Sequence, residues 1–199
     1  MSRLAKIHGR FDRMGVNEWA AAPPAGTPVG ATCNHNFELT SESYDRVFAD
    51  LKRAAGTGQN VIDLGAGCGR GVAHAVGSGA FRRAVGIEIV PLRVTAARAA
   101  LRDLKLTKRA SIIEGSFADY SVDAPAAMCF DVAYDRATIK ELARILSKST
   151  ECKAFVSFRP PSRWEADGLA GYEVTSSQRV KTSGGERFTA FVYKRAPME

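Results

Sequence analysis

The sequence contains few cysteines, and their placement argues against a zinc site. Cys33, Cys68, Cys129 and Cys152 are scattered over 199 residues, no pair has C-x-x-C spacing, and the three histidines do not cluster with them. Metal-binding cysteines recur at short and regular spacings. We therefore expect free thiols in a reducing compartment and no metal site.

Long hydrophobic runs are also missing. No apolar stretch approaches the roughly 20 residues that a membrane-spanning helix needs. The N-terminal segment 1–15 is basic, has no apolar core of the kind found in secretory signals, and contains too little serine to favour a transit peptide. These absences predict a protein that is not secreted and does not contact membranes.

The composition that remains is that of one globular domain. The chain is 45% hydrophobic and 25% charged, and 199 residues are enough for one full core. Its formal net charge of +7 favours an acidic partner: a nucleic acid, an acidic protein surface or an anionic cofactor. The alternative is solvated surface charge with no such partner.

The first 36 residues differ from the rest of the chain. Segment 20–31 is rich in Pro, Gly and Ala and has no periodicity, so we expect residues 1–36 to form an irregular basic arm ahead of a domain spanning 37–199. Trp19 in this arm is a candidate lid over a ligand. The basic residues available to contact nucleic-acid phosphates or an acidic protein surface are Arg3, Lys6, Arg10, Arg13, Arg159 and Arg163.

Strand and helix patterns alternate from residue 37 to residue 158, which predicts an α/β fold with a parallel sheet and right-handed crossovers. After residue 158 the pattern changes. Segment 159–168 is predicted to be a loop with little room for a helix, and 172–195 an antiparallel hairpin around 181–185. Strands are expected at 60–64, 82–89, 109–115, 128–135 and 152–158, and helices at 41–55, 71–77, from Pro91 and from Ala137.

The segment NVIDLGAGCGRG at 60–71 places glycines at every second position after a buried strand. In doubly wound sheets, ligands bind at the carboxyl ends of the strands. A Cβ atom on Gly65, Gly67 or Gly69 would block a ligand from approaching the backbone, and some of these positions are expected to need positive φ. The loop is therefore a predicted nucleotide-type binding site.

The residues around the glycines distinguish between cofactors. A dinucleotide loop reads G-x-G-x-x-G, whereas this loop reads G-A-G-C-G-R-G, and a P-loop is excluded because no G-K-[ST] follows. Asp63 would repel a pyrophosphate but suits a cofactor with an ammonium and a sulfonium. Glu88, which ends the second strand, is placed to accept two ribose hydroxyl hydrogens. A nicotinamide enzyme and a glycine-rich turn in an unrelated α/β protein remain the alternatives.

The segments VIDLGAGCGRG and AVGIEI resemble the first two motifs of class I S-adenosylmethionine (SAM) methyltransferases, and the resemblance covers roughly residues 37–195. It implies a doubly wound, mostly parallel seven-stranded sheet with a C-terminal antiparallel hairpin, and SAM as the cofactor. In that family the glycine loop passes beneath the methionine part, the first acid orients the ammonium and the second holds the ribose. The implied SAM-binding residues are Asp63, Gly65, Ala66, Gly67, Gly69, Glu88, Ile89, Ser116 and Phe117. Asp119 and Glu114 are further candidates for the adenine contact, and core packing is the alternative for Phe117.

The end of the fourth predicted strand bears on the substrate. It lacks the [DN]-P-P-[YF] motif of enzymes that methylate adenine or glutamine nitrogens, and no cysteine pair indicates cytosine carbon chemistry. Segments 34–51, 115–117, 152–164 and 180–195 resemble the disruptor-of-telomeric-silencing family of non-SET histone lysine methyltransferases. The chain departs from that family where Lys181 replaces a tryptophan, Arg187 replaces a tyrosine, and Tyr134-Asp135-Arg136 replaces N-N-F.

This second resemblance implies a protein-lysine N-methyltransferase acting on histone or another chromatin protein, located in the nucleus if that substrate is right and in the cytoplasm otherwise. Tyr134, Asp135 and Phe188 are the candidate catalytic residues, as walls of a narrow apolar channel that favours the neutral amine. Tyr134 as a core residue and Asp135 as the cap of the helix that follows are the alternatives. An RNA or small-molecule methyltransferase and an inactive SAM-binding module are the competing functions.

Overall fold

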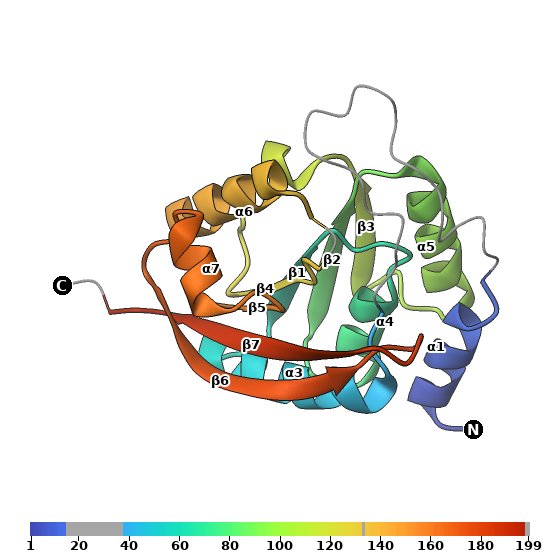
Figure 1. Cartoon of the computed structure of the whole chain (residues 1–199). Helices are drawn as coiled ribbons and strands as arrows, with labels where there is room; N and C mark the ends of the chain where they lie inside the picture. The colour runs from blue at the N-terminus through green and yellow to red at the C-terminus, as the bar shows by residue number, and fades with distance from the viewer. Residues whose placement is uncertain (15–37, 133, 198–199) are drawn as a thin grey trace.

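The computed structural model describes residues 1–14, 38–132 and 134–197, which contain one seven-stranded sheet (Figure 1). The strand order is β3-β2-β1-β4-β5-β7-β6. Strands β1 to β5 run parallel to one another, and β7 is antiparallel to both β5 and β6. The predicted doubly wound, mostly parallel sheet with a C-terminal hairpin is therefore confirmed. The strands are β1 (Asn60–Leu64), β2 (Arg83–Glu88), β3 (Ala110–Glu114), β4 (Ala126–Cys129), β5 (Ala154–Ser157), β6 (Tyr172–Lys181) and β7 (Arg187–Arg195).

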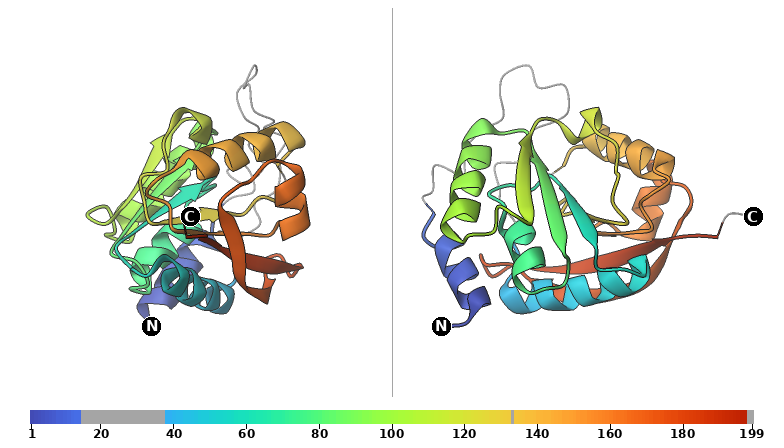
Figure 2. Two further views of the ribbon diagram at one scale, coloured as in Figure 1. Left: turned by 90° about the vertical axis from the view of Figure 1, so that its left-hand side faces the viewer. Right: turned by 180° about the vertical axis from the view of Figure 1, so that it is seen from behind.

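Helices cover both faces of the sheet, and each face has its own apolar cluster (Figures 1 and 2). One cluster joins the sheet to α1 (Arg3–Phe11), α3 (Ser41–Ala55), α4 (Arg70–Gly77) and α5 (Pro91–Asp103). The other joins it to η1 (Phe117–Asp119), α6 (Arg136–Lys148) and α7 (Pro161–Ala166). None of the helices in the described ranges is long and apolar enough to cross a membrane.

Local sequence signals explain where the predicted helices begin and end. The Thr40 hydroxyl accepts a hydrogen bond from the Ser43 amide and caps α3, and Gly56 ends that helix with a φ of 68°. Pro91 occupies the first turn of α5, where its missing N–H costs nothing. One face of α3 is buried, with the apolar residues Tyr44, Val47, Phe48 and Leu51.

The N-terminal segment differs from its prediction. Residues Arg3–Phe11 form helix α1, which is capped by Ser2 and buries Ile7 and Phe11. The prediction of an irregular arm is therefore wrong for these residues, because Leu4, Ile7 and Phe11 follow a helical period that the basic composition obscured. Residues 15–36 of the predicted arm, including Trp19 and segment 20–31, lie outside the described residues.

The segment after β5 also differs from its prediction. We expected a loop at 159–168, but Pro161–Ala166 form the short helix α7. Its Trp164 is buried and donates from Nε1 to the Ser157 hydroxyl over 3.1 Å. The tertiary contacts of Trp164 therefore hold this helix in place. The helix itself is too short to show a periodic pattern in the sequence.

Candidate functional site

The glycine loop lies at the carboxyl edge of the sheet, next to the point where the strand order changes direction between β1 and β4. The amides of Gly65 and Ala66 both donate to the Ile87 carbonyl, over 3.0 and 2.9 Å. These two bonds turn the chain across the end of β2. The loop therefore leaves β1 and reaches the start of α4 directly above the strand that carries Glu88.

The backbone of this loop needs glycine, as predicted. Gly65, Gly67 and Gly69 have φ values of 101°, 54° and 86°, in the region that L-residues with a Cβ avoid. A Cβ on Gly65 would lie 1.6 Å from the hydroxyl oxygen of Tyr134. The bare backbone at Gly65 thus accommodates a protein side chain that covers the loop, which the sequence did not reveal.

A glycine outside the loop is equally necessary, and the sequence analysis did not single it out. A Cβ on Gly86 in β2 would lie 2.5 Å from the Cβ of Ala66 and 2.9 Å from a methyl carbon of Val72. Gly86 therefore lets the glycine loop and the first turn of α4 pack directly on β2. Its place inside the AVGIEI strand was the available signal, since glycine in a strand marks a close backbone approach.

Asp63 is the most unusual polar group of the site. It is 3% exposed, and its Oδ1 atom has no hydrogen-bond partner among the residues that the structure describes. Burial, followed by the charges of Glu88 and Glu38, raises the pKa of Asp63 to about 8. A buried carboxyl in this state would be stabilised by a cationic ligand, because such a ligand would compensate the charge that burial now disfavours.

Glu88 is held at the end of β2 by the loop itself. Its Oε2 accepts a hydrogen bond from the Gly67 amide over 2.7 Å, and its Oε1 accepts one from the Val90 amide over 2.9 Å. A carboxylate has about four acceptor positions, and these two bonds use two of them. The remaining positions fit the predicted acceptance of two ribose hydroxyls.

The predicted adenine side is made by the end of β3 and the turn η1. The Ser116 hydroxyl caps η1 by accepting from the Ala118 amide over 3.2 Å. Phe117 is nearly buried, with its ring centroid 5.9 Å from that of Tyr134. Ile89 is partly exposed beside Glu88. The structure thus brings Phe117 to the side chain that covers Gly65, while Ser116 has a local structural role.

The three predicted catalytic residues each make a contact that has a structural role. Tyr134 packs with the α6-side cluster and donates from its hydroxyl to the Leu64 carbonyl over 2.9 Å. Asp135 caps α6 by accepting from the Thr138 amide over 2.8 Å. Phe188 packs with the α3-side cluster, its ring 5.2 Å from that of Phe158. Their assignment as one channel wall stays a prediction, and each has a structural role of its own.

A further buried acid, besides Asp63 and Glu88, lies at the carboxyl edge and was not predicted. Asp131 follows β4, and its carboxylate accepts from the Ser157 hydroxyl over 2.8 Å and from the Phe158 amide over 2.9 Å. Burial raises its pKa to about 6, although these hydrogen bonds oppose the shift. Beside it, the rings of Phe130 and Phe158 stack at 5.1 Å. This corner joins the ends of β4, β5 and β7.

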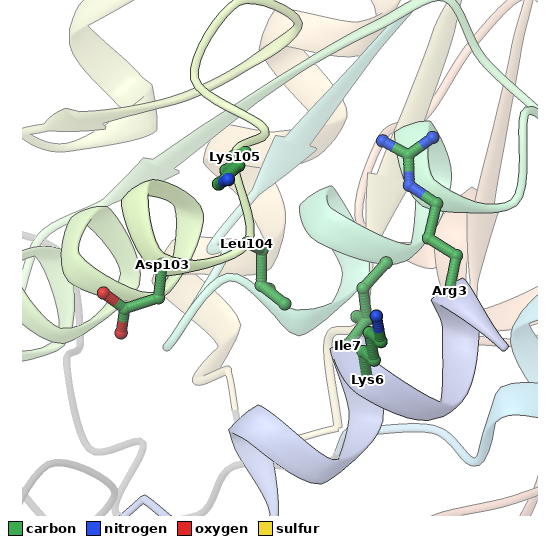
Figure 3. Close-up of a pocket in the computed structure, with 6 residues that line it drawn as sticks. All are labelled: Arg3, Lys6, Ile7, Asp103, Leu104 and Lys105. Carbon is green, nitrogen blue, oxygen red and sulfur yellow. The ribbon is translucent and has the colours of Figure 1, made fainter. Parts of the chain in front are cut away.

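A cavity of about 260 Å³ lies elsewhere, between α1 and the turn after α5 (Figure 3). Its carboxylate, on Asp103, accepts from Arg10 over 2.9 Å. Among the described residues, no ion pair involves the three cations that line the cavity. The lining residues are Arg3, Lys6, Ile7, Asp103, Leu104 and Lys105. The same ranges contain no cluster of three or more His, Cys, Asp or Glu residues suited to a metal ion.

Solved structures share the fold of this chain. The methyltransferase domain of bacterial CtHen1-C superposes with a TM-score of 0.62 at 17% identity, over 79% of this chain and 98% of its own. The chain has the class I methyltransferase fold. Magnesium protoporphyrin IX methyltransferase (ChlM) from Synechocystis PCC 6803, solved with bound SAM, gives 0.61 at 17% identity over 98% of both chains.

A third structure with the class I methyltransferase fold is the B. subtilis tRNA methyltransferase TrmK, with a TM-score of 0.61 at 15% identity over 81% of this chain and 68% of its own. No protein-family model and no curated protein sequence matches the chain. At these identities the likeness shows the fold, and the reaction has to be argued from the residues of the site.

Proposed function

We propose that this chain is a SAM-dependent methyltransferase. The observation that carries the proposal is the buried Asp63 carboxyl, with an unpartnered oxygen at the end of β1, next to a glycine loop that is hydrogen bonded to Glu88. SAM has an ammonium and a sulfonium for a buried acid and ribose hydroxyls for a second one. ChlM, whose structure has the same fold, was solved with SAM and with SAH bound.

The residues of the site fit the cofactor part by part. Asp63 would hold the ammonium, Glu88 the ribose hydroxyls, and the loop from Gly65 to Gly69 would pass beneath the methionine part. When bound, SAM supplies an electrophilic methyl group for in-line transfer to a nucleophile. The protein's own contribution is to hold the two reactants at attack distance and to exclude water, for which the buried edge around Tyr134 and Phe117 is suited.

The competing cofactor is a nicotinamide dinucleotide, and calorimetry with the full chain separates the two. We expect SAM and its demethylated product to bind, and NAD and NADP not to bind, because the loop lacks the G-x-G-x-x-G spacing of a dinucleotide site. Binding of a dinucleotide without binding of SAM would refute the proposal. Tight SAM binding without methyl transfer to any substrate would instead support an inactive SAM-binding module.

For the substrate we propose RNA ahead of protein lysine. Lysine transfer on histone or another chromatin protein rests on the resemblance of the chain's terminal segments. Each of its predicted channel residues, Tyr134, Asp135 and Phe188, has a structural contact that explains its position without a channel. RNA is supported by the cavity whose cations Arg3, Lys6 and Lys105 have no ion-pair partner in the described chain. TrmK shows that this fold serves a tRNA methyltransferase.

A transfer assay with methyl-labelled SAM tests the substrate directly. Total RNA, nucleosomes, free histones and a small-molecule extract would be offered in parallel. We expect label in RNA, at a level that falls with added salt because phosphate contacts are screened. Label in histones or nucleosomes alone would contradict the RNA proposal and revive the lysine reading, and label only in the extract would indicate a small-molecule enzyme.

A further inference from the structure

A row of partly buried side-chain hydrogen bonds joins helices α1, α4 and α3. The proposed function does not yet account for it. His8 Nε2 lies 2.9 Å from His74 Nδ1, and His74 Nε2 lies 2.9 Å from Asp45 Oδ1. On its other side, His8 Nδ1 lies 3.4 Å from the Nη1 atom of Arg70. One residue from α1 therefore connects two residues of α4.

The carboxylate at one end fixes the direction of this row of hydrogen bonds. Asp45 can only accept, so His74 Nε2 carries a proton and donates to it. His74 Nδ1 of the neutral ring then accepts from His8 Nε2, and His8 Nδ1 accepts from Arg70. Burial is the first cause that lowers the pKa of both rings, to about 4 for His8. Both histidines are therefore neutral at pH 7, in the tautomers that this chain of donors requires.

Arg70 is where this row of hydrogen bonds meets the cofactor loop. It is the first residue of α4, directly after Gly69, and it is 2% exposed. Its guanidinium also pairs with Asp12 at the end of α1, over 2.8 Å, and with the buried Glu38. Phe11 of α1 lies beneath the guanidinium, 5.6 Å from ring centroid to Cζ. Two residues of α1, His8 and Phe11, and its C-cap residue Asp12 thus contact one buried cation.

The same cation bears on the electrostatics of the cofactor site. Glu38 is one of the charges that raise the pKa of Asp63, so the position of Arg70 beside Glu38 affects how that carboxyl is charged. Removing the partners of a buried charge is costly, because the charge remains without compensation. Without α1, Arg70 would keep Glu38 but would lose its contacts with His8, Phe11 and Asp12, directly beside the loop that ends at Gly69.

We propose that α1 is a positioning part of the cofactor site, in which His8 holds Arg70 and thereby the glycine loop in their binding geometry. The proposal rests on the proposed function, since it concerns the affinity for SAM. His8 acts through Arg70 and is not expected to touch the cofactor. Two sites are coupled when one changes the affinity of the other, typically by a factor of 5 to 150.

The decisive variant is His8→Phe in the full chain, which keeps a ring but removes both nitrogens. We expect the SAM affinity measured by calorimetry to fall about tenfold. We also expect amide hydrogen exchange of residues 65–73 to become faster in the absence of SAM. His8→Gln, whose amide nitrogen can still donate to His74, should recover most of the affinity, which a purely space-filling role would not produce.

Two further variants complete the design. Ala5→Gln changes an exposed position of the same helix and should leave both measurements unchanged. Asp12→Asn removes the negative charge of one Arg70 partner but keeps an oxygen that can accept, on a side chain that is 59% exposed, so it should fold normally and weaken SAM binding by a smaller factor than His8→Phe. It decides the question if His8→Phe does not fold.

The outcomes separate the two proposals. If the wild type and His8→Phe bind SAM equally well and exchange equally slowly, the positioning role is refuted. Equal losses in His8→Phe and His8→Gln would also refute it, because packing alone would explain them. A wild type that does not bind SAM would contradict the proposed function, while the exchange comparison, which needs no cofactor, would still decide whether α1 stabilises the loop.

Discussion

Gly67 and Glu88 share one hydrogen bond, so at the scale of the residue the loop and the predicted ribose acceptor support each other. Gly67→Ala places a Cβ at a φ of 54°, and Glu88→Ala removes the acceptor. We expect each to lower SAM affinity at least tenfold, or about 1.4 kcal/mol, by calorimetry. Gly79→Ala is the control, because its φ is 79° with no atom within 4 Å of the new Cβ. Unchanged binding in both site variants would contradict the assignment.

The raised pKa of Asp63 predicts that SAM binding releases a proton. Its pKa near 8 means that it is mostly protonated at pH 7 in the free protein. An ammonium beside it favours the charged form, so SAM binding should release close to one proton at pH 7, and SAM affinity should rise between pH 5.5 and 7.5. Calorimetry in buffers with different ionisation enthalpies measures the release. Asp63→Asn should show no release, and an equal release in that variant would assign the proton to another group.

At the scale of the element, the strands could be predicted because each is a short apolar run bounded by turn residues, and the parallel order follows from their alternation with helices. The short helices could not. Helix α7 depends on Trp164 reaching Ser157. Helix α1 has a helical period that its basic composition obscured, but its docking on α4 has no local signal. A contact between residues 66 apart in the chain, such as His8 with His74, leaves no periodic trace in either segment.

Some residues of the candidate site could likewise be predicted from the sequence, and others could not. Asp63, the loop glycines and Glu88 could be identified because one local motif carries each of them. Gly86 and the Arg70–Glu38 pair could not, because their roles depend on how the loop packs in three dimensions. Tyr134 was predicted as a channel residue, and only its position over Gly65 shows that it covers the cofactor loop.

The docking of α1 predicts a sensitivity to acid. The folded-state pKa of His8 is depressed to about 4 from its usual 6.5, so its contribution to stability is full above pH 6.5 and is lost as the pH falls toward 4. Protonation would place a charge beside His74 and Arg70, with Asp12, Asp45 and Tyr44 as the other facing groups. Urea unfolding at pH 7 and pH 5 should show a smaller loss of free energy in His8→Gln than in wild type. Equal losses would exclude this origin.

At the scale of the whole molecule, two features lie at opposite ends of α5. The helix begins next to Glu88 at the carboxyl edge of the sheet, and its 13 residues span about 20 Å before the cavity at Asp103–Lys105. A polynucleotide is long enough to contact both places, whereas a small substrate contacts only the carboxyl edge. Use of the cavity would therefore support a polynucleotide substrate over a small one, without involving the proposed methyl-transfer site.

Reversing the charges of this cavity tests that distinction. The triple variant Arg3→Glu, Lys6→Glu, Lys105→Glu should weaken RNA binding and reduce the slope of log affinity against log salt by about 2, because three phosphate contacts are lost. SAM affinity should stay unchanged, since the three side chains are outside the predicted SAM-binding residues and outside the His8–Arg70 contact through which α1 is proposed to act. Lys140→Glu, an exposed charge on α6, is the control. Filter binding at several salt concentrations supplies the slopes. If the triple variant and the control have the wild-type slope, RNA does not use this cavity, and the +7 net charge reflects solvated surface residues.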